Sequence, residues 1–310
     1  MSSIDVHQHL WPESLLAALA GRRRPPCLTR GADGWTLRID GEPDALVDLA
    51  DHDPDRRLRA LDAHGVSRAL VAPSLPLGVE ALPADEAAPL IDAYHAGAAD
   101  LPARFGAWAA VGLAEPDGRA LDDLLDRGFV GACIAAEALS SPAGFAALRD
   151  VLDVLERRGA PLFVHPGPSP QTLCIPCAND VPGWWPAMTR YVASMNAAWH
   201  AFAVAGRPAH PRLRVCFAML AGLAPLQRER LVARGGRSAA DPLTFVDSSS
   251  YGARAVDAVI RELGVDALVH GSDLPVVDGR EPALGAAVRE AIRERNPARL
   301  LASQITEASV

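Results

Sequence analysis

Two histidines near the start of the chain have a spacing that is typical of metal ligands. His7 and His9 are separated by one residue in a short apolar segment that is predicted to form a β-strand. Because side chains at positions i and i+2 of a strand point to the same side, both imidazoles can converge on one cation. His165 ends another apolar run, and Asp273 follows a third. Three neutral imidazoles and one carboxylate suit Zn²⁺ best, and they also accept Mn²⁺ or another divalent transition ion.

Histidines that only satisfy local backbone groups are the alternative. We favour that interpretation for four histidines on predicted helices or connections, namely His52, His64, His95 and His210.

A metal ion held by His7, His9, His165 and Asp273 would make a bound water molecule reactive at neutral pH. Bound Zn²⁺ lowers the pKa of its water to about 7, which supplies hydroxide, and it also polarises a substrate carbonyl. Asp273 would lie near enough to take a proton from that water, so we predict that it is the catalytic residue as well as a ligand. Metal and aspartate together are sufficient to hydrolyse an ester, a lactone or an activated amide.

Short apolar runs alternate with longer helical patterns along the chain. The runs span residues 4–7, 67–73, 105–111, 129–135, 161–165, 213–219, 243–247 and 267–271. Apolar strands that are each followed by a helix are typical of a parallel sheet buried on both faces. The pattern predicts an α/β protein with a (β/α)8 TIM barrel fold, in which functional side chains gather at the carboxyl ends of the strands. A doubly wound open sheet is the alternative, but no glycine-rich phosphate turn follows the first strand.

Two long segments interrupt this alternation, and both leave from the predicted catalytic face. Residues 10–51 follow the first strand and include a possible small strand at 35–39, and residues 166–186 follow the fifth strand. Long loops on this face are more often functional than idle. We predict one barrel domain over residues 1–310 with long insertions after strands 1 and 5, in which the insert 10–51 caps the active-site face.

Candidate substrate-binding residues lie in or near these segments. Trp11, Trp184 and Trp185 flank the ligand-bearing strand ends and can wall an apolar pocket. They can equally pack on the barrel rim or against a second subunit. Glu137 follows the fourth strand and is a candidate for substrate contact, and Arg254 could receive a substrate carboxylate.

The composition excludes several classes of function. The chain has 310 residues and a formal net charge of −8, so it offers no basic field for nucleic acid or anionic lipid. No apolar run is long enough for a membrane span, and the first residues lack the pattern of a signal peptide. We therefore expect a cytoplasmic protein that acts on a small molecule, and we allow for a homodimer. Cys174 and Cys177 have CxxC spacing, but one pair is not a four-ligand zinc site.

Motifs in chain order support a more specific assignment. They are IDVHQH at 4–9, RLRALDAHGV at 57–66, RFG at 104–106, HP at 165–166, DSS at 247–249, GSDLP at 271–275 and NPARLL at 296–301. This set resembles the amidohydrolase superfamily, and within it the amidohydrolase-2 branch, which contains aminocarboxymuconate-semialdehyde decarboxylase, related aromatic-acid decarboxylases and several lactone hydrolases. The resemblance implies a metal-dependent (β/α)8 barrel with one divalent ion held by His7, His9, His165 and Asp273.

The absence of lysine bears on the number of metal ions. All 30 basic residues are arginine, which excludes a Schiff-base lysine and a P-loop lysine. Binuclear members of the superfamily bridge two metals with a carboxylated lysine or a glutamate after strand 4, where this chain has only Glu137 nearby. A mononuclear site is therefore predicted.

One departure from the branch concerns proton transfer. After strand 6 the branch usually has a histidine in a His-x-Gly-Gly-x-x-Pro pattern, whereas residues 219–225 read MLAGLAP. Met219 therefore stands at the place of the histidine that, in the decarboxylases, activates the metal-bound water or the substrate. A thioether is at most a weak acceptor and cannot transfer a proton.

From the sequence we predict a metal-dependent hydrolase of a small organic acid, lactone or amide that uses a metal-activated water. A nonoxidative decarboxylase of the same branch is the alternative, although it needs a proton delivered to carbon, which Met219 cannot supply. A barrel that has lost catalysis and acts as a binding protein is the second alternative.

Overall fold

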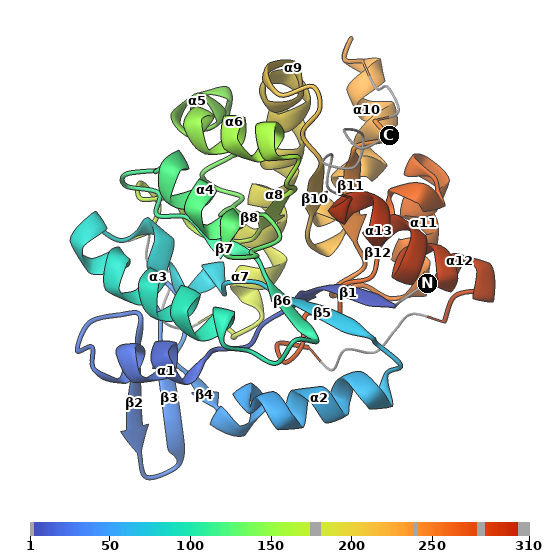
Figure 1. The fold of residues 1–310 in the computed structure, drawn as a ribbon. Helices are drawn as coiled ribbons and strands as arrows, with labels where there is room; N and C mark the ends of the chain where they lie inside the picture. The colour runs from blue at the N-terminus through green and yellow to red at the C-terminus, as the bar shows by residue number, and fades with distance from the viewer. Residues whose placement is uncertain (1–2, 174–180, 238–240, 278–282, 303–310) are drawn as a thin grey trace.

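A ring of short parallel strands forms the centre of the molecule in the computed structural model (Figure 1). The structure describes residues 3–173, 181–237, 241–277 and 283–302. The strands of the ring are β1 (Ile4–Gln8), β5 (Arg68–Val71), β6 (Phe105–Ala107), β7 (Ala109–Ala110), β8 (Ala132–Ala135), β9 (Leu162–His165), β10 (Val215–Phe217), β11 (Thr244–Asp247) and β12 (Leu268–Val269). Neighbours in this order pair in parallel from β1 to β6 and from β7 to β12.

Two junctions close the ring. Trp108 lies between β6 and β7, and its buried indole donates from Nε1 to the carbonyl of Val6 in β1 at 3.0 Å. On the other side, the Val6 N–H donates to the carbonyl of His270 at 2.9 Å, and Gln8 forms a parallel bridge with Leu274. The predicted (β/α)8 barrel is therefore confirmed, with the third predicted strand divided in two at Trp108.

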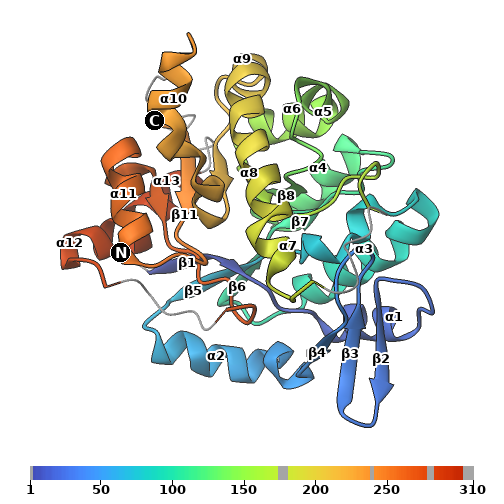
Figure 2. The same cartoon turned by 180° about the vertical axis from the view of Figure 1, so that it is seen from behind.

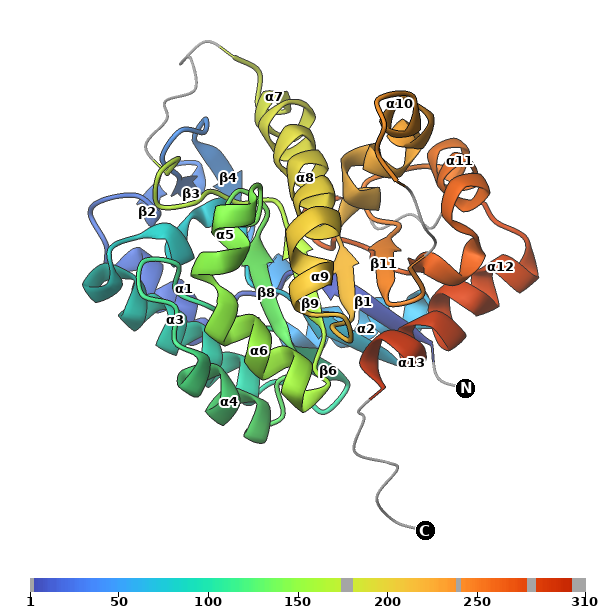
Figure 3. The same cartoon turned by 90° about the horizontal axis from the view of Figure 1, so that it is seen from above.

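Helices surround the ring, as the view from above shows (Figure 3). They are α1 (Glu13–Ala20), α2 (Pro54–Ala63), α3 (Ala84–Ala99), α4 (Gly118–Asp126), α5 (Pro142–Ala147), α6 (Arg149–Arg158), α7 (Trp185–Met188), α8 (Arg190–Ala201), α9 (Arg207–Ala209), α10 (Arg228–Ala233), α11 (Ala253–Leu263), α12 (Ala286–Glu290) and α13 (Asn296–Leu301). Within the described residues, no helix combines the length and apolar character that crossing a membrane requires.

Local sequence signals account for the ends of these helices. Asp53 begins α2 by accepting a hydrogen bond from the Arg56 N–H on its carboxylate, as an N-cap does. Gly65 follows α2 at φ 60°, and Gly159 ends α6 at φ 59°, a left-handed conformation that glycine adopts without steric cost. The strands β8, β9, β10 and β11 are buried along their whole length, as their apolar sequences predicted.

The first insertion contains α1 and a small antiparallel sheet beside the barrel (Figures 1 and 2). Its strands are β2 (Cys27–Gly31), β3 (Gly34–Arg38) and β4 (Ala45–Val47), with β3 in the middle. The small strand expected at 35–39 corresponds to β3. The second insertion leads from β9 to α7 and contains residues 174–180, which are outside the described part of the chain.

Candidate metal centre

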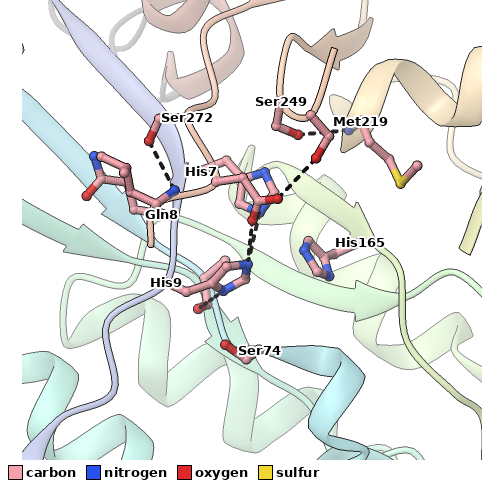
Figure 4. A network of polar contacts seen from close by, with 12 residues as sticks. His7, Gln8, His9, Ser74, His165, Met219, Ser249 and Ser272 are labelled. Atoms are coloured by element: carbon pink, nitrogen blue, oxygen red, sulfur yellow. Dashed lines mark hydrogen bonds and ion pairs between the residues drawn. The ribbon is translucent and has the colours of Figure 1, made fainter. Parts of the chain in front are cut away.

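The structure brings the four predicted ligands together at the carboxyl ends of the barrel strands. His7 lies in β1, His9 directly follows it, His165 ends β9, and Asp273 follows β12. All four side chains are buried, and one ligand atom from each lies within 4.8 Å of the others. Figure 4 shows the three imidazoles turned toward one another. Their ring centroids are 4.9 to 5.0 Å apart in edge-to-face arrangements.

Each imidazole is oriented by an oxygen acceptor on its outer nitrogen. Nδ1 of His7 contacts Oδ2 of Asp247 at 2.7 Å, Nδ1 of His9 contacts the carbonyl of Ala72 at 3.1 Å, and Nδ1 of His165 contacts the carbonyl of Pro166 at 2.8 Å. A proton on Nδ1 is thereby favoured in each neutral ring, which leaves Nε2 as the atom that can ligate a metal, and Nε2 of His7 and Nε2 of His9 lie 3.1 Å apart. Histidine ligands of protein-bound metals are oriented in this way.

Asp273 supplies the carboxylate of the cluster from a left-handed backbone conformation, with φ 58°. Its Oδ1 lies 3.4 Å from Nε2 of His7 and 3.2 Å from Nε2 of His9, but has no hydrogen-bond partner of acceptable geometry. Its Oδ2 accepts a hydrogen bond from Ser250 at 3.2 Å. A buried carboxylate oxygen without a partner is costly unless a cation or donor meets it. The donor set and this oxygen together fit one divalent ion.

The charges of the cluster depend strongly on one another. Burial opposes protonation of His7, but the carboxylates of Asp247 and Asp273 outweigh it and raise the pKa of His7 to about 9. Burial and the nearby His7 and His9 lower the pKa of His165 well below its ordinary value. Burial would raise the pKa of Asp273, but the neighbouring imidazoles hold it well below its usual range. Negative charge concentrated among imidazoles attracts a cation.

Asp247 is a functional residue that the sequence analysis did not single out. It ends β11, is completely buried, and contacts His7 through Oδ2. Its Oδ1 accepts hydrogen bonds from the hydroxyl of Ser249 at 2.6 Å, from the Ser249 N–H at 3.0 Å and from the Met219 N–H at 2.8 Å. The DSS motif at 247–249 was the signal, but its meaning depends on a contact with a residue 240 positions away.

Met219 begins a turn of unusual conformation after β10. The φ values of Met219, Leu220, Ala221, Gly222 and Leu223 are 45°, 50°, 54°, 59° and 63°. A left-handed backbone costs non-glycine residues roughly 1–2 kcal/mol each. The Met219 N–H is fixed by Asp247 and Ser249, and the turn packs on α8, where Gly222 lies against the backbone of Val192. The turn is therefore held by tertiary contacts rather than by local preference.

Two of the predicted substrate-binding residues are engaged in contacts within the chain. Trp11 is buried, stacks on His52 with ring centroids 4.4 Å apart, and donates from Nε1 to Ser74 at 2.8 Å. Glu137, which follows β8, accepts a hydrogen bond from Thr172, and its Oε1 lies 3.7 Å from Nε of Arg190. A role for either residue in substrate binding stays a prediction.

The other candidates are placed at the surface. Trp184 and Trp185 are 58% and 42% exposed and lie against each other, and Arg254 is exposed in α11. Their substrate contacts also stay predictions. Cys174 and Cys177 lie outside the described residues.

Three of the histidines for which we favoured a structural role make polar contacts within the chain. His52 accepts the Trp11 N–H, and His95 accepts the Ala110 N–H at 3.0 Å. Burial lowers the pKa of both to about 4, with a contribution from nearby arginines, so each is neutral at pH 7. His210 contacts Asp153 at 3.0 Å.

Solved structures with the same fold are numerous. 2,6-Dihydroxybenzoate decarboxylase from Rhizobium is 18% identical, with a TM-score of 0.66 over 97% of this chain and 98% of that one. 5-Carboxyvanillate decarboxylase from Sphingomonas paucimobilis is 16% identical, with a TM-score of 0.71 over 97% and 99%. The 5-carboxyvanillate decarboxylase from Novosphingobium aromaticivorans, solved with manganese and 4-hydroxy-3-methoxy-5-nitrobenzoic acid, is 15% identical, with a TM-score of 0.70 over 97% and 96%.

These similarities extend over nearly the whole chain and show its fold. No protein-family model and no curated protein sequence matches the chain. The barrel implied by the resemblance to the amidohydrolase-2 branch is therefore the observed one.

Proposed function

We propose that the chain is a metal-dependent nonoxidative decarboxylase of the amidohydrolase superfamily, which acts on a small aromatic or enoic carboxylic acid. The observation that carries the proposal is the buried cluster of three oriented imidazoles and the unpartnered Oδ1 of Asp273. The three similar structures named above are decarboxylases, which supports this activity over the hydrolysis that we first expected from the sequence.

His7, His9, His165 and Asp273 are the residues that would hold the ion. When bound, a divalent ion supplies a positive charge that orients the substrate and stabilises negative charge in the transition state. Manganese is the first ion to test, because the similar Novosphingobium enzyme was solved with it, and zinc suits the same ligands.

Asp273 is the residue to which we assign proton transfer. Loss of CO2 breaks the bond between the carboxyl group and the substrate carbon and leaves an electron pair on that carbon. Asp273 is ionised at rest, so it would first accept a proton from the substrate or from solvent and then deliver that proton to the carbon, which restores the carboxylate. The hydrogen bond from Ser250 to Oδ2 keeps Oδ1 turned toward the imidazoles, where the substrate would meet it.

We also propose that the insert 10–51 covers the mouth of the barrel. Glu42, between β3 and β4, accepts a hydrogen bond from Arg190 at 2.8 Å and another from the hydroxyl of Tyr191. The same Arg190 lies beside Glu137 after β8. The small sheet is thus tied to the face of the barrel that carries the ligands, where it would exclude water from the reaction.

Hydrolysis of a lactone, ester or amide is the second candidate, and Met219 is the observation that favours it. Hydrolysis by a metal-activated water and Asp273 does not need the proton-transferring histidine that Met219 replaces. Decarboxylation makes a larger demand on proton delivery, which here falls on Asp273 alone.

The test is a paired assay of purified protein loaded with Mn²⁺ or Zn²⁺. Aromatic acids with a hydroxyl group beside the carboxyl group, and enoic acids, are assayed for CO2 release, and aryl esters and lactones for hydrolysis. We expect metal-dependent CO2 release that a chelator removes and that Asp273→Asn abolishes. Hydrolysis without CO2 release would select the second candidate. Fewer than about 0.2 ions per chain after loading would overturn both enzymatic proposals.

A further inference from the structure

Arg57 is a buried arginine whose hydrogen bonds lead to both ends of the ligand set. It lies in α2, outside the ring of strands, and is only 4% exposed. It donates from Nη1 to the carbonyl of His9 at 2.9 Å and from Nη2 to the carbonyl of Leu274 at 3.1 Å. Nη2 also donates to Oε1 of Gln8 at 2.5 Å. One guanidinium therefore contacts a ligand residue in the β1 segment and the residue next to Asp273.

Asp5 makes the complementary contacts from the other side of the same junction. Its Oδ1 accepts the His7 N–H at 3.1 Å and the Ser272 N–H at 3.0 Å. Its Oδ2 accepts Nε2 of Gln8 at 2.7 Å, so that Gln8 joins Asp5 to Arg57. The side chains of Asp5, Gln8 and Arg57 are all buried. Gln8 donates to Asp5 through its amide nitrogen and accepts from Arg57 through its amide oxygen. The polar atoms of the network are joined in this way except for Nε of Arg57, which is buried without a hydrogen-bond partner.

The network holds the backbone on both sides of Asp273. Asp5 binds the preceding residue, Ser272, and Arg57 binds the following one, Leu274. Between them Asp273 has φ 58°, which a non-glycine residue keeps only when its surroundings impose it. Direct backbone bonds add to this, since the Asp273 N–H donates to the His7 carbonyl at 2.9 Å and the His9 N–H donates to the Leu274 carbonyl at 2.7 Å.

We propose that Arg57, acting through Gln8 and Asp5, is a positioning residue for the metal centre, which sets the distance between the His7–His9 pair and Asp273. The planar guanidinium is suited to this function because its donors are fixed in one fork, and here that fork spans two segments that are adjacent only when the barrel has closed. The inference rests on the proposed metal site and does not depend on which reaction occurs there.

A second buried arginine provides a matched control. Arg214 precedes β10 at the amino ends of the strands, donates from Nε to the carbonyl of Leu300 at 2.8 Å, and also binds the carbonyl of Gly159. It is 7% exposed and, like Arg57, serves backbone carbonyls of two segments. It lies at the opposite end of the barrel from the ligands, so a change there tests fold stability alone.

The experiment measures the affinity for Mn²⁺, without substrate, by competition with a chelator, together with the unfolding free energy of the metal-free protein. We expect Arg57→Lys, which keeps the charge but loses the fork, to bind Mn²⁺ about 10- to 100-fold more weakly than the wild type. Arg214→Lys should lose a similar amount of stability but keep its affinity within about twofold. Gln8→Met, which breaks the link between Arg57 and Asp5 and retains side-chain volume, should weaken Mn²⁺ binding about tenfold.

The inference would be overturned if Arg57→Lys bound Mn²⁺ as tightly as the wild type. It would also be overturned if Arg214→Lys lost as much Mn²⁺ affinity as Arg57→Lys. If Arg57→Lys does not fold, Gln8→Met decides in the same way. A wild-type chain that binds neither Mn²⁺ nor Zn²⁺ would overturn both this inference and the proposed function. Because the measurement contains no substrate, a negative decarboxylation assay has no effect on it.

Discussion

At the scale of single residues, the orientation of His7 depends most directly on Asp247. This carboxylate is completely buried and contacts Nδ1 of His7 at 2.7 Å. We predict that Asp247→Asn lowers the affinity for Mn²⁺ about 10- to 100-fold, because the amide keeps the shape but loses the charge that fixes the ring and strengthens Nε2 as a donor. The measurement is chelator competition on the metal-free protein.

The control for this change is Asp241→Asn. Asp241 lies just before β11, at the other end of the same strand, and binds Arg207 and Thr244. It should leave the affinity unchanged, and an equal loss in both variants would contradict the role assigned to Asp247.

Met219 offers a second test at this scale. A histidine tolerates the left-handed conformation found there and could transfer a proton. We predict that Met219→His raises the rate of CO2 release at least tenfold, since a positioned general acid or base contributes about 10² to 10⁴. Met219→Leu, which adds no titratable group, should leave the rate unchanged. Identical rates for the histidine and leucine variants would show that proton delivery does not limit this enzyme.

The sequence predicted the ligand cluster because its signals are local. His7 and His9 point to one side by strand alternation, and His165 and Asp273 follow strands that a parallel barrel brings to the same end. It did not predict Asp247 or Arg57 as supporting residues, because the meaning of a buried polar side chain lies in its partner. Those partners, His7 for Asp247 and Leu274 for Arg57, are 240 and 217 positions away.

At the scale of elements, the turn that begins at Met219 depends on Gly222. A Cβ at this position would lie 2.8 Å from the carbonyl oxygen of Val192 and 3.2 Å from Cβ of Met195, both in α8. Gly222→Ala should therefore destabilise the protein by about 2 kcal/mol or more, from the left-handed backbone and from the overlap together. Chemical unfolding provides the measurement.

Gly235→Ala separates the two causes. Gly235 has φ 81°, but a Cβ there would meet nothing within 4 Å, so only the backbone cost of about 1 kcal/mol applies. If Gly222→Ala and Gly235→Ala lost the same unfolding free energy, the turn that begins at Met219 would not pack tightly on α8.

The same turn shows where prediction of elements from the sequence ends. The run 213–219 was expected to remain a strand to Met219, yet β10 ends at Phe217. Its continuation is apolar and resembles a buried strand, and nothing local in Leu220 or Ala221 favours a positive φ. Tertiary contacts with Asp247 and α8 impose that conformation. The strands themselves were predictable, because burial on both faces leaves a continuous apolar signal.

At the scale of the whole molecule, Glu80 links folding stability to pH. It is 5% exposed, its Oε2 has no hydrogen-bond partner, and it lies near Tyr94 and Cys133. Burial raises the pKa of Glu80 from 4.5 to about 7. The native state therefore holds this proton more tightly than the unfolded chain. Its contribution to the free energy of unfolding is complete below pH 4.5 and is lost as the pH rises through 7.

We predict that the wild type loses about 3 kcal/mol of unfolding free energy between pH 4.5 and pH 8 relative to Glu80→Gln, because each tenfold difference in proton affinity between the folded and unfolded chain is worth ~1.4 kcal/mol. Urea unfolding at both pH values gives the comparison. Glu115→Gln, at an exposed position, serves as the control, and its unfolding free energy should change between the two pH values as that of the wild type does. If Glu80→Gln also follows the wild type at both pH values, the side chain is already ionised in the folded protein.

The closure of the ring between β1 and the segment after β12 sets the order in which this protein can acquire its ion. Asp5 and Ser272, which meet at that junction, are 267 positions apart. During synthesis on the ribosome, His7 and His9 are added long before Asp273, which follows only when most of the barrel has been made. Metal capture by all four proposed ligands is therefore a late event of biogenesis, which waits for the closure of the barrel.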